Sequence, residues 1–193
     1  MLNSNKTVLV LPLLLMLIMF VGGYFFLSDT EEITNEQLKE KIELEASYHE
    51  NGSLLVVNGE WNWSVMPIEG LYGDDYIGVA IPNVNNHNEI VATLELTYAD
   101  DIIEQIDGKV VDNGIVFTFP NAMIEQISYG NSGRFKVEID HQHNVDVDEL
   151  SVHYLHTWTN HAPLDIEDAI FQTPTFEEAQ DVPHWVLSKQ LKK

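Results

Sequence analysis

The hydrophobic residues of this chain follow two different patterns. Residues 7–27 form one uninterrupted apolar run, TVLVLPLLLMLIMFVGGYFFL. After residue 41 the apolar residues instead recur at every second position. In the first such stretch Ile42, Leu44, Ala46 and Tyr48 alternate with Glu43, Glu45 and Ser47. A period of two is typical of a β-strand with one buried face.

Turn signals divide the rest of the chain into short segments of this kind. Asn51-Gly52 predicts a tight hairpin that returns through residues 54–57, and Asn58-Gly59 suggests a bulge or a second turn. Asp112-Asn113-Gly114 predicts a hairpin between residues 110–111 and 115–119. Further strands are expected at residues 61–65, 76–81, 91–98, 124–129, 134–139 and 151–158.

The 124–129 and 134–139 strands would form one more hairpin through Gly130–Gly133, whereas residues 99–107 suggest a helical turn. Short strands that follow one another with frequent turns, and without a long amphipathic helix, predict an all-β fold. We expect an antiparallel β-sandwich, and an immunoglobulin-like sandwich on the basis of strand number alone.

The two flanks of this β region have a different character. Residues 29–40 are polar and suggest a juxtamembrane stalk, within which Thr34 and Gln37 have the spacing of a capping box. The C-terminal tail, residues 160–193, is expected to carry short helices at 175–179 and 184–192. The predicted domain therefore covers residues 41–193.

The N-terminal apolar run, within residues 1–28, is predicted to be a transmembrane signal-anchor. Its 21 residues carry no charge, and as a helix they would extend about 31 Å, close to the thickness of a hydrocarbon core. Lys6 precedes the run and acidic residues follow it, so the positive-inside rule places the N-terminus in the cytoplasm and the domain outside. A cleaved signal peptide is the alternative, and it exports the domain equally.

The charge of the chain narrows the choice of partners. Acidic side chains number 31 against 9 basic ones, for a net charge of −22. Such a surface repels phosphate backbones, which excludes nucleic acid, and attracts cations and basic partners. Solubility in salty surroundings is the simpler explanation of the acidity. The absence of cysteine excludes disulfides, thiolate metal sites and cysteine nucleophiles.

Two groups of residues near the C-terminus suggest metal ligands. His141 and His143 would face the same way on a strand, as zinc or copper ligands require, and His153, His156 and His161 lie in the same His-rich segment, 141–161. Asp146 and Asp148 offer oxygen ligands suited to calcium. The EF-hand pattern fails, because Val145 replaces the required Gly and Ser151 replaces the required Glu. A solvated acidic loop explains the same residues.

The remaining candidates do not form a recognisable catalytic site. The tryptophans could make a carbohydrate-stacking face, but core packing explains them better. With 31 acidic residues no particular carboxylate pair stands out for glycoside hydrolysis, and neither a phosphate-binding Gly loop nor an HExxH motif is present.

We therefore expect a membrane-anchored, extracytoplasmic binding or assembly module that is not an enzyme and has no cofactor. Its partner would be another envelope protein or a cell-wall component. The alternative is a divalent-metal-binding ectodomain, with calcium on the acidic loops or copper or zinc on segment 141–161. A hydrolase of wall polymers is a third hypothesis.

Overall fold

A computed structural model describes residues 6–28, 32–82, 90–140, 145, 147–160, 163–165, 168–177 and 181–193. The chain divides into two compact units, with the boundary between Glu32 and Ile33. The first unit contains helix α1 (Lys6–Ser28), which includes Pro12. Large apolar side chains from Val10 to Phe25 are exposed on it.

None of the helices in the described part of the chain combines the length and the apolar character that crossing a membrane requires. The membrane span predicted for residues 7–27 is therefore not supported by the structure.

The second unit begins with a short N-terminal segment that packs against the β-structure. Helix α2 (Asn35–Leu38) starts at Thr34, and both hydrogen bonds of the predicted capping box with Gln37 are present. Ile33, Asn35 and Leu38 are buried. Residues 33–40, predicted as part of a stalk, therefore belong to the folded unit.

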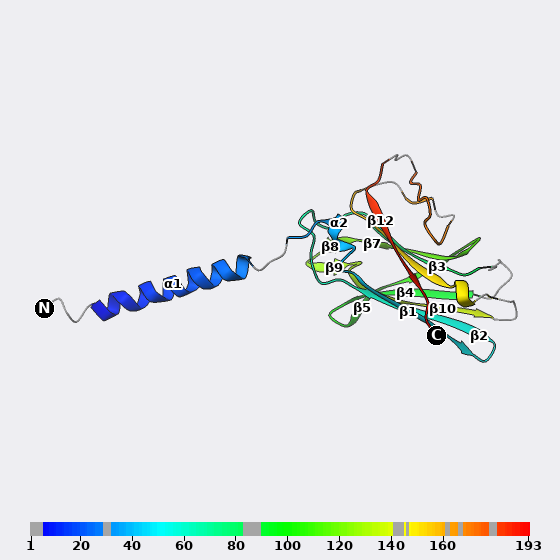
Figure 1. Ribbon diagram of the computed structural model, residues 1–193, viewed down its shortest axis with the longest axis horizontal. Coiled ribbons are helices and arrows are strands. Elements are labelled where there is room, and N and C mark those ends of the chain that lie inside the picture. Colours follow the sequence, from blue (N-terminus) through cyan, green and yellow to red (C-terminus); the bar gives the residue numbers. More distant parts are fainter. Residues whose placement is uncertain are drawn as a thin grey trace. The chain divides into compact units, whose positions relative to one another are not determined.

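Ten strands form two antiparallel five-stranded sheets, which lie one above the other in Figure 1. The first sheet has the order β1-β2-β10-β4-β5. Its strands are β1 (Glu43–Asn51), β2 (Leu54–Asn62), β10 (Ser132–Asp140), β4 (Ile90–Tyr98) and β5 (Asp101–Asp107). The second sheet has the order β12-β11-β3-β7-β6. Its strands are β12 (His184–Gln190), β11 (Ser151–Thr157), β3 (Asp74–Ala80), β7 (Gly114–Pro120) and β6 (Lys109–Val111).

Two smaller elements complete the described structure. Strands β8 (Ala122–Ile124) and β9 (Ile127–Tyr129) form a separate hairpin, and a 3₁₀ turn, η1 (Val147–Glu149), precedes β11. The expectation of a mostly β, antiparallel, sandwich-like fold is confirmed.

The main hydrophobic core lies between the two sheets. Alternating residues of both sheets contribute to it, as a sandwich requires. Trp61 and Trp63 are both buried there, and the ring of Trp61 lies 5.1 Å from that of Phe119 on the opposite sheet. The prediction that these tryptophans pack in the core is confirmed, so they do not form an exposed stacking face.

The second sheet is covered on its outer face as well. The chain between β11 and β12, drawn above the upper sheet in Figure 1, contributes a second apolar cluster there. Its members are Tyr76, Val111, Val116, Leu155, Leu164, Ala169, Phe171, Phe176 and Val182. Asn113 holds this covering segment through hydrogen bonds with Asp168 (2.6 Å) and the backbone N–H of Ala169 (2.8 Å). Among the described residues, no segment covers the outer face of the first sheet in this way.

Two hairpin turns that the sequence did not predict make three predicted elements wrong. These are the helical turn at 99–107, the single strand at 124–129, and the hairpin between 124–129 and 134–139. Residues 101–107 form strand β5 and not a helical turn, because Ala99 and Asp100 both have positive φ angles (48° and 71°) and close a tight hairpin. Glu125 and Gln126 do the same (51° and 70°) between β8 and β9. Residues 134–139 therefore do not pair with 124–129, and β10 pairs with β2 and β4.

Two further corrections depend on packing between distant segments. The tail predicted to be helical at 184–192 forms strand β12, which pairs with β11 and buries Trp185. Strand β2 runs through Asn58 and Gly59 with an unbroken register, so no bulge or turn is present there. Gly59 is required because the Phe135 ring occupies the space that a Cβ atom would need.

The connections at one end of the sandwich form a surface that we call the entry end, because Ile33 lies there. It consists of Ile33, the β2–β3 loop (63–73), the β4–β5 turn (99–100) and residues 121–131. Backbone hydrogen bonds join these segments: Ile68 N–H donates to Ile33 (2.9 Å), and Trp63 N–H donates to Asn131 (3.0 Å). The end of β10 and the start of β11 lie at the opposite end.

The covering segment predicts an effect of one substitution in β3. A Cβ atom at Gly78 would collide with the backbone carbonyl of Ala169. Gly78→Ala is therefore expected to lower the free energy of unfolding by about 1–3 kcal/mol, the usual cost of overpacking. Urea unfolding measures the change. Ser47→Ala on the open face should change it little, and an equal effect of both variants would contradict the close packing over Gly78.

Candidate functional site

The predicted metal ligands are only partly within the described structure. His141, His143 and Asp146, like His161, lie outside the described residues. Asp148 lies in η1. Within the residues that the structure describes, no three His, Asp or Glu side chains come together as a metal site would require. The metal-site prediction therefore stays a prediction.

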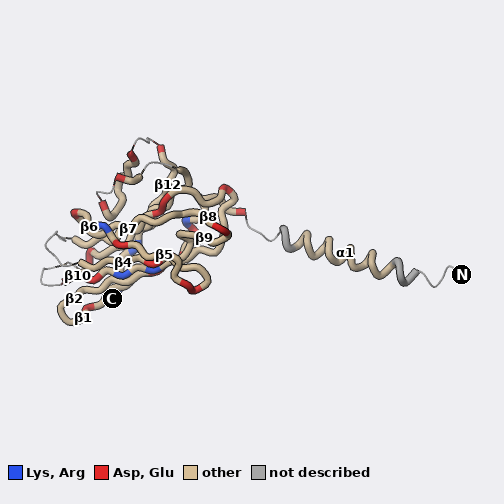
Figure 2. The backbone as a smooth tube through the Cα atoms, turned by 180° about the vertical axis from the view of Figure 1, so that it is seen from behind, with Lys and Arg blue, Asp and Glu red and all other residues tan. Residues whose placement is uncertain are grey.

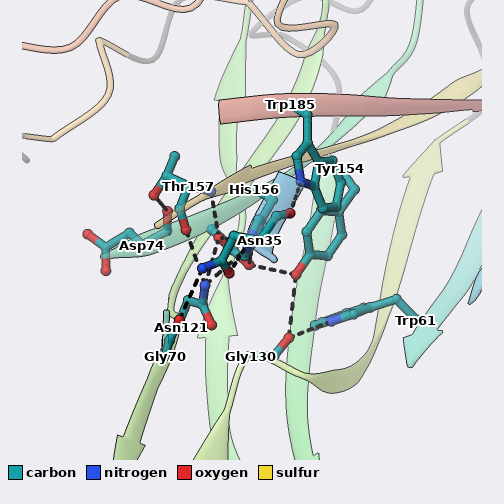
Figure 3. A network of polar contacts seen from close by, with 11 residues as sticks. Asn35, Trp61, Gly70, Asp74, Asn121, Gly130, Tyr154, His156, Thr157 and Trp185 are labelled. Atoms are coloured by element: carbon teal, nitrogen blue, oxygen red, sulfur yellow. Dashed lines mark hydrogen bonds and ion pairs between the residues drawn. The ribbon is translucent and has the colours of Figure 1, made fainter. Parts of the chain in front are cut away.

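The histidine with the most contacts is His156 on β11, and it lies entirely inside the protein (Figure 3). Its Nδ1 lies 2.9 Å and 3.1 Å from the two carboxylate oxygens of Asp75 on β3. Its Nε2 lies 3.1 Å from Oδ1 of Asn35 in α2. Three segments that are far apart in the sequence thus meet at one imidazole ring.

The hydrogen bonds of Asn35 orient its side chain toward His156. The Asn35 Nδ2 group donates to Glu69 (3.0 Å) and to the carbonyl of Gly70 (3.2 Å), so Asn35 Oδ1 faces the imidazole as an acceptor. The Nε2–H group of His156 therefore donates to Asn35, and Nδ1 faces Asp75 in a buried pair that is an ion pair when the ring is protonated.

The Asp75 carboxylate is satisfied by further donors. The Tyr154 hydroxyl donates at 2.7 Å, the backbone N–H of Thr157 at 3.0 Å, and the side-chain amide of Asn121 at 3.4 Å. Burial, followed by the negative charge of Asp75, raises the pKa of Tyr154 well above its usual value. Tyr154 therefore stays a neutral donor to the carboxylate.

Three indole rings surround the His156 imidazole. The ring centroids of Trp185, Trp158 and Trp63 lie 4.8, 5.6 and 6.5 Å from that of His156. Trp185 also donates its indole N–H to the backbone carbonyl of Asn35 (2.8 Å). These contacts contribute to the complete burial of the imidazole.

This network holds segments together and does not present reactive groups to solvent. The side chains of His156 and Asp75 are both 0% exposed, so no substrate reaches them in this conformation. The parity of His156 with Tyr154 and Trp158 along the strand correctly indicated a packed residue. Nothing in the sequence paired it with Asp75, which belongs to an ordinary-looking Asp74-Asp75 loop.

His153 lies on the opposite side of β11 and makes separate contacts. Its ring nitrogens contact the hydroxyl oxygens of Ser151 (2.9 Å) and Ser188 (2.8 Å). Burial lowers the pKa of His153, although the charge of Asp168 opposes this effect. His153 and His156 therefore do not share a metal site.

The open face of the first sheet contains a groove of about 610 Å³. One cross-strand row lies across it, because register pairs Glu45 with Glu60, Glu60 with Arg134, Arg134 with Glu95, and Glu95 with Gln105. A second hollow of about 460 Å³ shares Glu45, Glu60 and Arg134 with this groove. The two hollows together make a polar trough across all five strands.

Some charged side chains in this trough form ion pairs and others, among the described residues, do not. Arg134 is the only arginine of the chain, and its Nε donates to Glu95 at 2.7 Å. Glu45 and Glu60 lie directly opposite each other on β1 and β2, both exposed, and within the described structure neither side chain makes an ion pair or hydrogen bond. Like charges directly opposite each other on neighbouring strands destabilise a sheet.

The buried His156–Asp75 pair predicts a large effect of removing either partner. His156→Gln is expected to lower the free energy of unfolding by about 3–5 kcal/mol, because Asp75 would lose its closest buried partner. The double variant with Asp75→Asn should lose less than the sum of the two single losses. Urea unfolding of the four proteins gives the coupling. Glu95→Gln, which breaks an exposed ion pair, is the control and should cost at most about 1 kcal/mol. Additive losses would contradict the ion pair.

His153 predicts how stability depends on pH. Because its pKa in the folded protein lies below the ordinary value of 6.5, the unfolded chain binds the extra proton first. Stability is therefore complete above pH 6.5 and falls as the pH decreases below it. His153→Gln should flatten the pH dependence of the unfolding free energy between about pH 7 and 5.5. Identical slopes for the two proteins would contradict the lowered pKa.

No protein-family model matches the chain, and no curated protein matches it. Among solved structures, the chain is similar to the collagen-binding subdomain of the Enterococcus faecalis surface protein ACE, with 12% identity over 79% of this chain and 97% of that one, at a TM-score of 0.36. It is also similar to the Danio rerio Fcho1 Mu homology domain with bound Eps15 peptide, with 6% identity over 81% of this chain and 46% of that one, also at 0.36. At these TM-scores the similarities support no conclusion about fold or function.

Proposed function

We propose that this protein is a non-enzymatic binding module whose ligand lies in the groove on the open face of the first sheet. The observation that carries the proposal is the exposed, uncompensated Glu45–Glu60 pair in that groove. Such a pair lowers the stability of the free protein, and a cationic ligand would remove the repulsion. Local features that cost stability are typical of functional sites.

We propose that the sandwich is immunoglobulin-like, and the strand order supports this. An immunoglobulin constant domain has strands A-B-E-D in one sheet and G-F-C in the other. Taken in chain order as A to G, the strands β1, β2, β3, β4, β10, β11 and β12 give β1-β2-β10-β4 and β12-β11-β3, the observed neighbours. Strands β5 to β9 would then be an insertion between D and E.

We also propose that α1 anchors the domain to the outer face of a membrane. Support comes from the uncharged run of residues 7–27 and from the exposed apolar side chains of α1, which need a non-aqueous environment. The partner would then be another envelope protein or a cell-wall component.

The charge of the domain favours a basic ligand. Residues 28–193 carry 31 acidic and 8 basic side chains, and Figure 2 shows acidic positions along much of the domain and few basic ones. In the groove the Nε of Arg134 donates to Glu95, whereas Glu45 and Glu60 make no ion pair in the described structure. An incoming amine or guanidinium would therefore meet these two carboxylates. An extended segment with lysine at alternate positions could direct several of them to one face.

Calorimetric titration of the full chain in detergent with a peptide of alternating lysines tests the proposal. The double variant Glu45→Gln and Glu60→Gln is expected to weaken binding by about tenfold or more. The matched control, Asp112→Asn with Glu149→Gln, removes the same charge away from the groove and should weaken binding much less. Glu60→Gln alone should stabilise the free protein by up to about 0.5 kcal/mol.

The outcomes distinguish recognition by the groove from attraction to the overall negative charge of the domain. If both double variants weaken binding equally, the peptide recognises net charge and not the groove. If the wild-type chain does not bind the peptide at all, a basic ligand is excluded and the proposal fails.

A further inference from the structure

The exposed apolar side chains of the domain are concentrated at the entry end. From Ile33 onward, eight large apolar side chains are exposed in the described structure, and seven of them lie there. They are Met66, Ile68 and Tyr72 in the β2–β3 loop, Tyr98 and Ile102 beside the β4–β5 turn, and Met123 and Ile124 in the β8–β9 hairpin. The eighth, Val91, lies near the opposite end of β4.

These side chains lie in the β2–β3 loop and at the ends of strands that flank two turns. The β4–β5 and β8–β9 turns are both tight hairpins whose two central residues have positive φ angles. In Figure 1 the β8–β9 hairpin and α2 lie together at the end of the sandwich where the N-terminal segment enters. Apolar side chains that gather at one end of an otherwise polar surface indicate an interaction site.

The covalent connection to helix α1 limits the distance between Ile33 and the end of that helix. Helix α1 ends at Ser28, and the domain begins at Ile33, which is part of the entry end. Five peptide steps extend at most about 18 Å. The chain therefore allows no more than that distance between Ser28 and Ile33.

The charges at the entry end indicate which kind of lipid surface it would contact. Glu69, Asp100, Asp101 and Glu125 lie beside the apolar side chains. Anionic headgroups would repel these carboxylates, so neutral zwitterionic lipids are the better match. Met, Ile and Tyr are side chains suited to the boundary between headgroups and acyl chains.

We propose that the entry end rests on the surface of a bilayer of neutral lipids and inserts its apolar loop tips at the headgroup boundary. This inference rests on the proposed anchoring by α1. The contact would fix the orientation of the domain and leave the groove on the first sheet accessible from the side.

Site-directed fluorescence tests the inference directly, because the chain has no cysteine. The full chain is reconstituted in phosphatidylcholine vesicles with a bimane label at Ile124→Cys, at Val91→Cys as the matched exposed control, or at Met16→Cys within α1. Brominated phosphatidylcholine quenches labels that touch the lipid. We expect loss of emission at positions 124 and 16 and little loss at 91. Phosphatidylglycerol should reduce the quenching at 124, and added salt should restore it.

A second set of variants tests the same lipid contact with the label at a different position. With the label at Met66→Cys, replacing Met123 and Ile124 by Ser should reduce the quenching, whereas Val91→Ser should not. If position 124 is quenched no more than position 91 while 16 is quenched, the helix is in the bilayer and the entry end makes no preferred contact with it, which overturns this inference alone. If position 16 is not quenched, the anchoring itself has failed, and this inference fails with it.

Discussion

A histidine hydrogen-bonded to an aspartate, both without solvent contact, is the interaction on which this domain depends. Removing two such polar groups from water destabilises the protein unless their hydrogen-bonding positions are satisfied. Here Asp75 receives four donors and the His156 ring has an acceptor at each nitrogen. Because these partners come from α2, β3, β11 and the segment after β7, the pair can form only when all of them are in place. It therefore couples the N-terminal segment to the second sheet.

The two sheets have different environments, and this difference decides where the protein can bind a ligand. The segment between β11 and β12 covers the outer face of the second sheet with apolar side chains and with a backbone contact over Gly78. The first sheet has an outer face of alternating polar residues that nothing in the described structure covers. A trough with exposed, like-charged glutamates on that face agrees better with recognition than with stability, because their repulsion opposes folding. The apolar entry end offers a second, chemically different surface at one end of the sandwich.

Periodicity in the sequence identified most of the strands, and it failed where a turn or a distant partner made the decision. The alternation at residues 42–48 and the Asn51-Gly52 turn predicted β1 and its hairpin correctly. The β5 strand was missed because its turn uses Ala99 and Asp100, which carry no strong turn signal. The tail strand β12 was taken for a helix because its hydrogen bonds come from β11, about 30 residues earlier. For the same reason the polar network was invisible: Asn35, Asp75 and His156 are ordinary residues until the fold joins them.

The sequence by itself determined the class of the protein: a long apolar N-terminal run, a cysteine-free and strongly acidic domain, and a β-fold with alternating strands. These properties depend on composition and on local spacing, which a chain carries before it folds. The tertiary structure alone decided which sheet face stays open, that Glu45 and Glu60 oppose each other and make no ion pair in the described structure, and that seven of the described exposed apolar side chains lie at one end. Each of these depends on register and on contacts between distant segments. Such contacts follow from the packing of the whole domain and not from any local pattern.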